Sequence, residues 1–471
     1  MVRTKIVITS NEILSSWKSE ENPFNSTDEI LSWVNDLNQK TYANVKETSI
    51  YNSDFWFYDD YKGEITNRRR SFFSVIGMRY FVNNAFVGEQ PIIVQPEIGY
   101  LGIITKLFDN QLFFLMQAKV EPGNVNCVQI SPTIQATKSN FMRVHGGNLP
   151  LYFNYFENSE RYEIIYDQIQ SEQGARFLKK RNRNIIICLS EEIEVYPNFK
   201  WMTLGQIKHL MKIDNLVNMD TRTVLSGLPI FFEKSGEKLN NFFSDDALYA
   251  SMYKQDPKRE LPNLYQKINN FKMFQDTVSA PIPLNQLVDW RVDEYGITCL
   301  KPYDFSVFFY DIEISGREVR HWTQPLFKAN GNATFGLIAK TIDGVRMFLV
   351  QFIAEIGSFD KIEIGPSVQW SATHSPARDN EIDKCFRRHV RNHGCAKGGG
   401  GEICFDAILS EEGGRFYHEQ NRNVIISVSE EDITIIPDNY IWLSYSTLNY
   451  LIQVNNCVNI QLRNLISLID I

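Results

Sequence analysis

The sequence repeats itself, and this repeat is the feature that most constrains its fold. Gln90-Pro91 recurs 234 residues later as Gln324-Pro325, and the offset holds without a gap well beyond these residues. The segment SEQGARF at 171–177 returns as SEEGGRF at 410–416, with an offset of 239 residues. Ordered recurrence of this kind indicates that one domain was duplicated.

We therefore predict two tandem domains. The first repeat covers 1–234 and begins with a helical segment, a polar connector covers 235–258, and the second repeat covers 259–471. Each copy contains several strand-like segments and closing helices. Strands that pair through tight turns favour the α+β class over a parallel, doubly wound sheet.

The composition limits the classes of protein to which the chain can belong. Its 471 residues are too many for one ordinary core. Acidic residues outnumber basic ones by 56 to 48, which argues against a nucleic-acid binder. No apolar run is long enough to span a membrane, and the start lacks the core of a signal peptide. The seven cysteines are scattered and suggest reduced thiols. We expect a soluble, cytoplasmic protein.

The stretch 113–140 has the clearest local pattern. Apolar and polar residues alternate over 116–121, a Pro-Gly-Asn turn follows, and the alternation resumes over 128–137. Two paired strands would therefore share one polar face. A solvated face is the alternative, but it usually carries more Lys and Glu than this Gln, Ser and Thr pattern. We favour a hydrogen-bonding pocket for a sugar or nucleotide.

Several motifs together resemble the NDP-hexose 2,3-dehydratase family. They are, in chain order, QAKVEPGN at 117–124, SPTIQATKSN at 131–140 followed by His145, SEQGARF and KKRNRN within 171–184, and DNLVNMDTR at 214–222. The second copy matches through SEEGGRFYHEQNRN at 410–423. The resemblance covers nearly the whole chain. It implies a duplicated fold of two Nudix-like domains, a homodimer and a dTDP-4-keto-6-deoxyhexose substrate.

The implied reaction needs no redox cofactor, because the ketone on sugar carbon 4 serves as the electron sink. That ketone acidifies the hydrogen on carbon 3, and the resulting enolate expels the hydroxyl on carbon 2. The enol then becomes a 3,4-diketo-2,6-dideoxy sugar. The protein must supply a base, donors for the enolate oxygen and an acid for the departing hydroxide. We expect no cofactor, no metal, and a downstream NADPH-dependent 3-ketoreductase.

Two other functions are weighed against this one. A non-catalytic nucleotide-sugar-binding protein would keep the arginines and aromatic residues but need no proton-transfer pair. A Nudix-type nucleotide-sugar hydrolase would need the glycine-led helix with REXXEE glutamates that holds metal, and this motif is not found in the sequence. The missing motif argues against pyrophosphate hydrolysis.

Comparison of the two copies indicates which one is catalytic. Lys119 becomes Ile353, Asp220 becomes Gln461, and His145 falls on no histidine. The second copy therefore lacks a cation, an acid and an imidazole. We predict the active site in the first copy and a degenerate pocket in the second.

The catalytic candidates are His145, Asp220, Lys119 and Glu121. Histidine titrates near neutral pH, although His145 beside two glycines can equally serve a local turn. Asp220 is a second acid or base, or it simply opens a helix. Lys119 can stabilise the enolate or contact a phosphate, or it forms a salt bridge with Glu121. Because Glu121 recurs in the second copy, a structural or shared binding role is favoured for it.

The binding candidates follow from the polar face, from the resemblance and from the arginines that recur in both copies. Guanidinium groups grip phosphate oxygens in pairs, although a packed ion pair explains each arginine almost as well. The predicted substrate-binding residues are Asn124, Gln129, Ser131, Thr133, Gln135, Thr137, Ser139, Asn140, Arg143, Arg176, Arg183 and Arg222. The residues predicted for the second, degenerate pocket are Glu355, Gln369, Arg415, Tyr417, Arg422 and Arg463.

One segment departs from the family pattern. Cys385, His389 and His393 are spaced four residues apart and would share one helix face, with Cys395 beyond them. This density of Cys and His resembles a zinc site, but the spacing matches no finger pattern and arginines interleave. A basic loop is the favoured interpretation.

Overall fold

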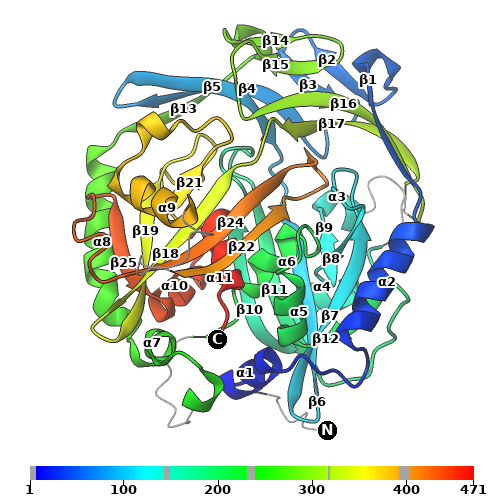
Figure 1. Ribbon diagram of the computed structural model, residues 1–471. Helices are drawn as coiled ribbons and strands as arrows, with labels where there is room; N and C mark the ends of the chain where they lie inside the picture. Colours follow the sequence, from blue (N-terminus) through cyan, green and yellow to red (C-terminus); the bar gives the residue numbers. More distant parts are fainter. Residues whose placement is uncertain (1–6, 143–148, 231–238, 317–318, 392–401) are drawn as a thin grey trace.

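Two mixed seven-stranded sheets form the body of the molecule (Figure 1). The computed structural model describes residues 7–142, 149–230, 239–316, 319–391 and 402–471. The sheet of the first copy has the order β10-β11-β6-β7-β12, with β8 on β7 and β9 on β6. Its strands are β6 (Gly99–Phe108), β7 (Gln111–Val120), β8 (Val128–Ser131), β9 (Ile134–Ala136), β10 (Glu163–Ser171), β11 (Arg181–Leu189) and β12 (Phe199–Met202).

The sheet of the second copy repeats this arrangement strand for strand. Its order is β22-β24-β18-β19-β25, with β20 on β19 and β21 on β18. In each sheet one central pair is parallel, β6 with β11 and β18 with β24. The strands are β18 (Thr334–Ile342), β19 (Val345–Ile353), β20 (Glu363–Gly365), β21 (Val368–Trp370), β22 (Glu402–Ser410), β24 (Gln420–Val428) and β25 (Tyr440–Ser444). The predicted duplication and mixed α and β content are confirmed.

Each of these sheets splits at one end. β6 and β7 pair from Ile104 and Leu115 outward, and beyond this point they separate. The predicted return segment fills the gap, because β8 pairs with β7 and β9 pairs with β6. The hydroxyl of Thr133 joins the two sides: it accepts from the Ile104 amide (2.9 Å) and donates to the Leu115 carbonyl. Ser367 makes the same two contacts in the second copy.

Helices from both copies pack into one shared core. The closing helix α6 of the first copy contacts α11 of the second, and each also lies on its own sheet. A single cluster of buried apolar residues includes Ile103 and Ile207 together with Leu337 and Leu462. The closing helices are α5 (Leu204–Leu210), α6 (Met219–Leu225), α10 (Tyr445–Ile452) and α11 (Ile460–Leu468). The two copies are therefore parts of one folded body.

The remaining helices cover the outside of the sheets. A capping box of Ser26 and Glu29 begins α2, and a capping box of Thr203 and Gln206 begins α5. The described part of the connector forms the short helix α7 and a π-helical turn at Ala250–Lys254, which bury Leu248 and Met252. These helices are α1 (Ser10–Lys18), α2 (Thr27–Lys40), α3 (Lys138–Phe141), α4 (Phe153–Glu157), α7 (Asp246–Tyr249), α8 (Pro257–Phe274) and α9 (Glu381–Arg391).

Two accessory sheets lie above the body in Figure 1, and the copies exchange a strand between them. β1 of the first copy pairs with β16 of the second, and β13 of the second pairs with β4 of the first. One sheet contains β2 (Trp56–Asp59), β3 (Glu64–Asn67), β4 (Ser74–Val82), β5 (Ala85–Val94) and β13 (Thr277–Ile282). The other contains β1 (Ala43–Thr48), β14 (Trp290–Val292), β15 (Gly296–Cys299), β16 (Phe305–Ile314), β17 (His321–Ala329) and β23 (Phe416–Tyr417).

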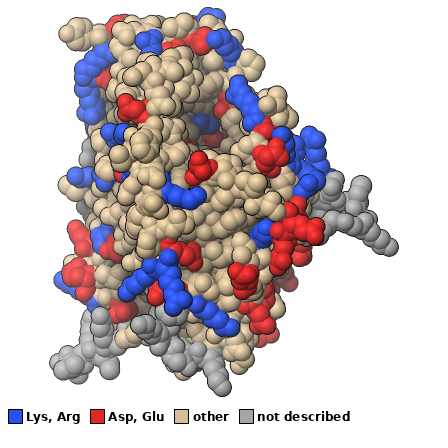
Figure 2. All heavy atoms as spheres, turned by 90° about the vertical axis from the view of Figure 1, so that its left-hand side faces the viewer, with Lys and Arg blue, Asp and Glu red and all other residues tan. Residues whose placement is uncertain are grey.

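The surface that carries α8 is of mixed charge. Figure 2 shows basic and acidic side chains in small, alternating groups on this face. Within the described residues, no helix combines the length and the apolar character needed to cross a membrane.

Candidate active site

A cavity of about 580 Å³ lies where the split sheet of the first copy meets the accessory sheets. Residues from both copies line it. The first copy contributes Lys119, Glu121, Gln135, Thr137, Asn140, Glu172, Lys180, Asn182 and Asp220, with Phe55, Trp56, Arg69, Phe72, Gln95 and Tyr100. The second copy contributes His321, Trp322, Thr323, Gln324, Glu412, Gly414 and Arg415. The site is thus composite, whereas the sequence comparison treated each copy as a separate pocket.

The split places Lys119, near the end of β7, and Glu121, just after it, close to Gln135 of β9. Gln135 Nε2 donates to Glu121 Oε1 (3.0 Å), and Lys119 Nζ lies 3.4 Å from the same oxygen. Lys119 Nζ also donates to the Gln135 carbonyl (3.2 Å). Both suggested features of Lys119, a cation in the pocket and an ion pair with Glu121, are therefore present together.

Asp220 reaches the cavity from the first turn of α6. Asn218 caps this helix, and its side-chain amide donates to Ser131 Oγ (2.9 Å) and Gln135 Oε1 (3.2 Å). Asp220 is only 2% exposed, and among the described residues its Oδ1 has no hydrogen-bond partner. Burial, reinforced by the negative charges of Glu172 and Glu412, raises the pKa of Asp220 well above its usual range. Its surroundings therefore favour the protonated form of Asp220.

Beside the cavity, the loop that contains Gly123 and the loop that contains Gly413 join the two copies through backbone hydrogen bonds. The Gly123 amide donates to the Gly413 carbonyl (2.7 Å), and the His418 amide donates to the Gly123 carbonyl (2.8 Å). The same pattern occurs in reverse, since the Gly357 amide donates to the Gly174 carbonyl (2.8 Å). The SEQG and SEEG segments therefore each contact a glycine loop of the other copy. This exchange brings Glu412 and Arg415 to the first-copy cavity.

Sequence reasoning missed Glu172, Lys180 and Glu412. Burial raises the pKa of Glu172 and Glu412, and a neighbouring carboxylate raises the pKa of each further. Burial also lowers the pKa of Lys180 to about 8. The comparison of the copies did not single out Glu172, because its counterpart Glu411 is also a glutamate. Residues shared by both copies were interpreted as structural. Lys180 and Glu412 differ from their counterparts in the other copy. This difference could have identified them as candidate site residues from the sequence.

The wall formed by the accessory sheets is aromatic. Phe55, Trp56, Phe72 and Trp322 line it, and Tyr100 lies on the adjoining edge of β6. The Arg415 guanidinium lies over the Phe72 ring, 4.2 Å from its centroid, and donates to Gln95 Oε1 (3.2 Å). Flat rings and a planar cation form a surface suited to stacking a nucleobase.

Five predicted binding residues hold the structure instead of lining the cavity. Thr133 joins the split strands, and Ser131 accepts from Asn218. Gln129 donates to Ser410 Oγ of the second copy (2.7 Å). Asn124 donates to the Cys127 carbonyl (2.9 Å), and the Ser139 amide donates to Glu97 Oε2 (3.0 Å). These contacts favour a structural role for the five residues, because their polar groups serve the sheet and the interface. Direct contact with substrate stays a prediction for them.

The predicted arginines are placed differently from the expectation. Arg183 pairs with Asp167 across neighbouring strands, with its Nε 2.7 Å from Oδ1. Arg222 is buried between the copies and donates to the Ser410 carbonyl (2.6 Å). Arg176 does not line the large cavity; its counterpart Arg415, predicted for the degenerate pocket, takes that place. The loop exchange is the reason for this reversal.

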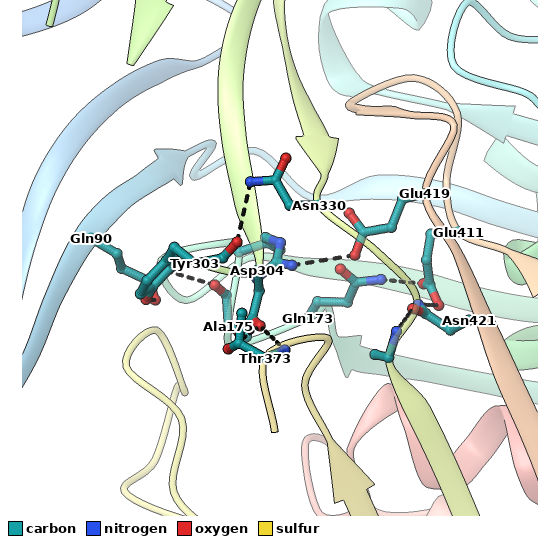
Figure 3. Close-up of polar contacts among 12 residues, drawn as sticks. Gln90, Gln173, Ala175, Tyr303, Asp304, Asn330, Thr373, Glu411, Glu419 and Asn421 are labelled. Atoms are coloured by element: carbon teal, nitrogen blue, oxygen red, sulfur yellow. Dashed lines mark hydrogen bonds and ion pairs between the residues drawn. The ribbon is translucent and has the colours of Figure 1, made fainter. Parts of the chain in front are cut away.

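The corresponding cavity on the second-copy side is small, about 130 Å³. Arg176 and Gln369 line it, as do Gln173 and Glu419. Arg176 Nη2 donates to Glu419 Oε1 (3.3 Å), and Gln173 donates to Glu411 (Figure 3). Where the large cavity has Lys180, this one has Glu419, so its arginine is neutralised by a neighbour.

The other residues predicted for the second pocket do not line this cavity. Glu355 accepts from Gln369 Nε2 (2.7 Å), and the Tyr417 ring stacks on Tyr310. Arg422 pairs with Asp406, and Arg463 donates to the Ser171 carbonyl (2.6 Å). The contacts of Glu355, Arg422 and Arg463 repeat those that the matching first-copy residues make.

Four of the residues singled out in the sequence lie outside the described ranges. His145 and Arg143 fall there, as do His393 and Cys395. His389 Nδ1 contacts the Cys385 carbonyl (2.9 Å), as expected for a helix. Among the described residues, no group of three or more His, Cys, Asp or Glu side chains is arranged to hold a metal ion.

Comparison with known proteins decides the family. The NDP-hexose 2,3-dehydratase model matches residues 27–228 and 262–469. The chain belongs to this family. It is therefore a dehydratase, and the predicted 2,3-dehydration of a nucleotide hexose is confirmed at the level of the family.

Three similar family members carry the same name, dTDP-4-dehydro-6-deoxy-α-D-glucopyranose 2,3-dehydratase. The one from Streptomyces violaceoruber is 34% identical over 90% of this chain and 92% of its own length. The one from Saccharopolyspora spinosa is 34% identical, covering 88% and 85%. The one from Amycolatopsis orientalis is 32% identical, covering 94% and 90%.

Proposed function

We propose that this dehydratase acts on dTDP-4-keto-6-deoxyglucose and converts it to a 3,4-diketo-2,6-dideoxy sugar nucleotide. The observation that carries the proposal is the composite cavity, which combines a buried carboxyl group whose pKa is raised, a lysine and further acidic side chains with an aromatic wall. The names of the three relatives support the choice of nucleotide and sugar.

The two walls suggest how the substrate lies. Thymine stacks on the aromatic wall, and the hexose lies against Lys119, Glu121 and Asp220. The diphosphate lies between them at Arg415 and Lys180, two cations close enough for Arg415 to lower the pKa of Lys180. In the small cavity the matching pair is Arg176 with Glu419, which is neutral overall. This contrast supports the large cavity as the place of diphosphate binding.

The reaction uses groups that the cavity already holds. Asp220 donates its proton to the hydroxyl leaving carbon 2, because burial keeps this carboxyl protonated. Lys119 stabilises the negative charge that develops on the oxygen of carbon 4. Glu121 and Gln135 hold the ammonium group of Lys119 in position through the contacts described above.

Several finer features belong to the same proposal. The enzyme works as a cytoplasmic homodimer, and its unstable product passes to an NADPH-dependent 3-ketoreductase. Both domains descend from a Nudix-like ancestor, and the split mixed sheet shared by the copies supports this descent. His145 remains a second candidate for proton transfer.

Incubation with dTDP-4-keto-6-deoxyglucose tests the proposal directly. A 3-ketoreductase and NADPH in the same reaction trap the product, and loss of NADPH absorbance reports dehydration. We expect absorbance loss that requires both enzymes, together with a product mass that reflects the loss of one water and the gain of two hydrogens from the reduction. Release of dTMP would identify a hydrolase instead, and unchanged substrate would identify a binding protein.

A further inference from the structure

The loop Ser410–Phe416 of the second copy delivers one carboxylate to the first-copy cavity. Its backbone is fixed there by the Gly123–Gly413 hydrogen bond, and a Cβ on Gly413 would stand 2.2 Å from Asn124 Oδ1. Glycine at 413 is therefore needed for the loop to approach this closely. The neighbouring residue, Glu412, lines the cavity together with Asp220 and Lys119.

Glu412 differs from the other glutamates of the cavity in its hydrogen bonds. Glu121 accepts from Gln135, and Glu172 accepts from Asn182 Nδ2 (2.7 Å). The second copy keeps both arrangements, so they support the fold. The Glu412 carboxylate accepts from the amide of Gly414 (3.1 Å), and within the described residues it receives no hydrogen bond from another side chain. It is available to a ligand.

Resting on the function proposed above, we propose that Glu412 is the base that removes the proton from carbon 3 of the keto-sugar. The first copy would then bind the substrate with its own acid and lysine, while the second copy supplies the base. At the matching position of the first copy stands Gln173, which cannot accept a proton and donates instead to Glu411. The small cavity thus lacks this base as well as the counterparts of Lys119 and Asp220.

The proton balance closes with these two groups. Glu412 takes the proton from carbon 3, and the electrons of that bond form the enolate between carbons 3 and 4. The enolate restores the ketone and breaks the bond from carbon 2 to oxygen, and Asp220 protonates the departing hydroxide to give water. The enol then loses its proton from oxygen 3 and gains one at carbon 2. The proton from oxygen 3 returns to Asp220, and the proton that carbon 2 gains comes from protonated Glu412.

Glu412→Gln tests the assignment with little change in shape, since glutamine already occupies the matching loop position. We expect turnover to fall by ~100- to 10,000-fold, with dTDP affinity within a few-fold of wild type. Exchange of the carbon-3 hydrogen in D₂O, followed by NMR, should be lost. Asp220→Asn should also lose turnover but keep this exchange, because proton removal precedes departure of the hydroxyl.

Glu412→Asp keeps a carboxylate one carbon further back and should retain a measurable part of the turnover. The rate of wild type should rise with pH as Glu412 ionises among Glu121, Glu172, Asp220, Lys119 and Arg415, and Glu412→Gln should remove this rise. Near-normal turnover, or persistent carbon-3 exchange in Glu412→Gln, would overturn the assignment. Because wild type is assayed alongside, such a result would leave the proposed dehydration itself intact.

Discussion

At the scale of single residues, the matched arginines Arg415 and Arg176 differ in their surroundings, and we propose that Arg415 contacts the substrate whereas Arg176 is structural. Arg415 faces the large cavity and has no acidic partner among the described residues, whereas Arg176 pairs with Glu419. We predict that Arg415→Gln raises KM by ~10- to 100-fold, the effect of losing about 1.5–3 kcal/mol of charged hydrogen bonding. Steady-state kinetics measures this change.

Arg176→Gln is the matched control for this prediction. Its KM should stay within a few-fold of wild type, because we propose that the reaction takes place in the large cavity. Equal effects of the two substitutions would contradict the placement of the diphosphate.

A second residue-scale prediction concerns pH. Burial raises the pKa of Glu363 to about 7, whereas in the unfolded chain it stays near 4.5. The folded protein therefore binds this proton more tightly, so the stabilisation is complete below pH 4.5 and is lost as pH rises through 7. The difference corresponds to about 3 kcal/mol of unfolding free energy.

Glu363→Gln should remove this part of the pH dependence. Glutamine fits, because the matching residue of the first copy is Gln129. Urea unfolding at several pH values between 4.5 and 7.5 should show a smaller decrease in the variant than in wild type. The exposed control Glu430→Gln should keep the wild-type slope. An unchanged slope in Glu363→Gln would show that Glu363 is ionised in the fold.

At the scale of elements, the contact between the two glycine loops decides whether the site forms. A Cβ on Gly123 would stand 1.6 Å from the Phe416 carbonyl oxygen, so the loops must move apart to accept it. We predict that Gly123→Ala destabilises the protein by ~1–3 kcal/mol or more and sharply reduces turnover, because Glu412 and Arg415 are displaced. Thermal unfolding and the coupled assay measure the two effects.

Gly88→Ala is the control, since a Cβ there meets no atom within 4 Å. It should change neither the melting temperature nor turnover appreciably. A Gly123→Ala variant that matched Gly88→Ala in both measurements would contradict the loop exchange.

At the scale of the whole molecule, strand exchange and the shared core make the two copies interdependent. β1 completes a sheet of the second copy and β13 completes one of the first. We predict that residues 1–234 and 235–471, expressed separately, fail to fold, because each leaves a strand unpaired and the α6–α11 face exposed. Circular dichroism and solubility measure this outcome.

Co-expression of the two fragments should give a soluble complex with measurable dehydratase activity, because the missing strands and loops are then supplied in trans. An intact single-chain sample is the reference. Folding of either fragment alone would contradict the interdependence of the copies.

The sequence by itself determined the duplication, the α+β class, the family and the positions of Lys119, Gln135 and Asp220. These follow from motifs, from alternation along a strand and from turn residues, which act over a few neighbouring residues. The same local logic did not reveal the structural role of Thr133, because alternation places its side chain on a face without showing that two strands separate there.

Only the tertiary structure decided which residues of each copy line each cavity. Glu412 and Arg415 reach the first-copy site through loops that meet at Gly123 and Gly413, far apart in the sequence. Their approach depends on the exchange of strands and on the packing of α6 against α11. Such contacts arise from the closure of the whole chain, so no pattern within one repeat specifies them.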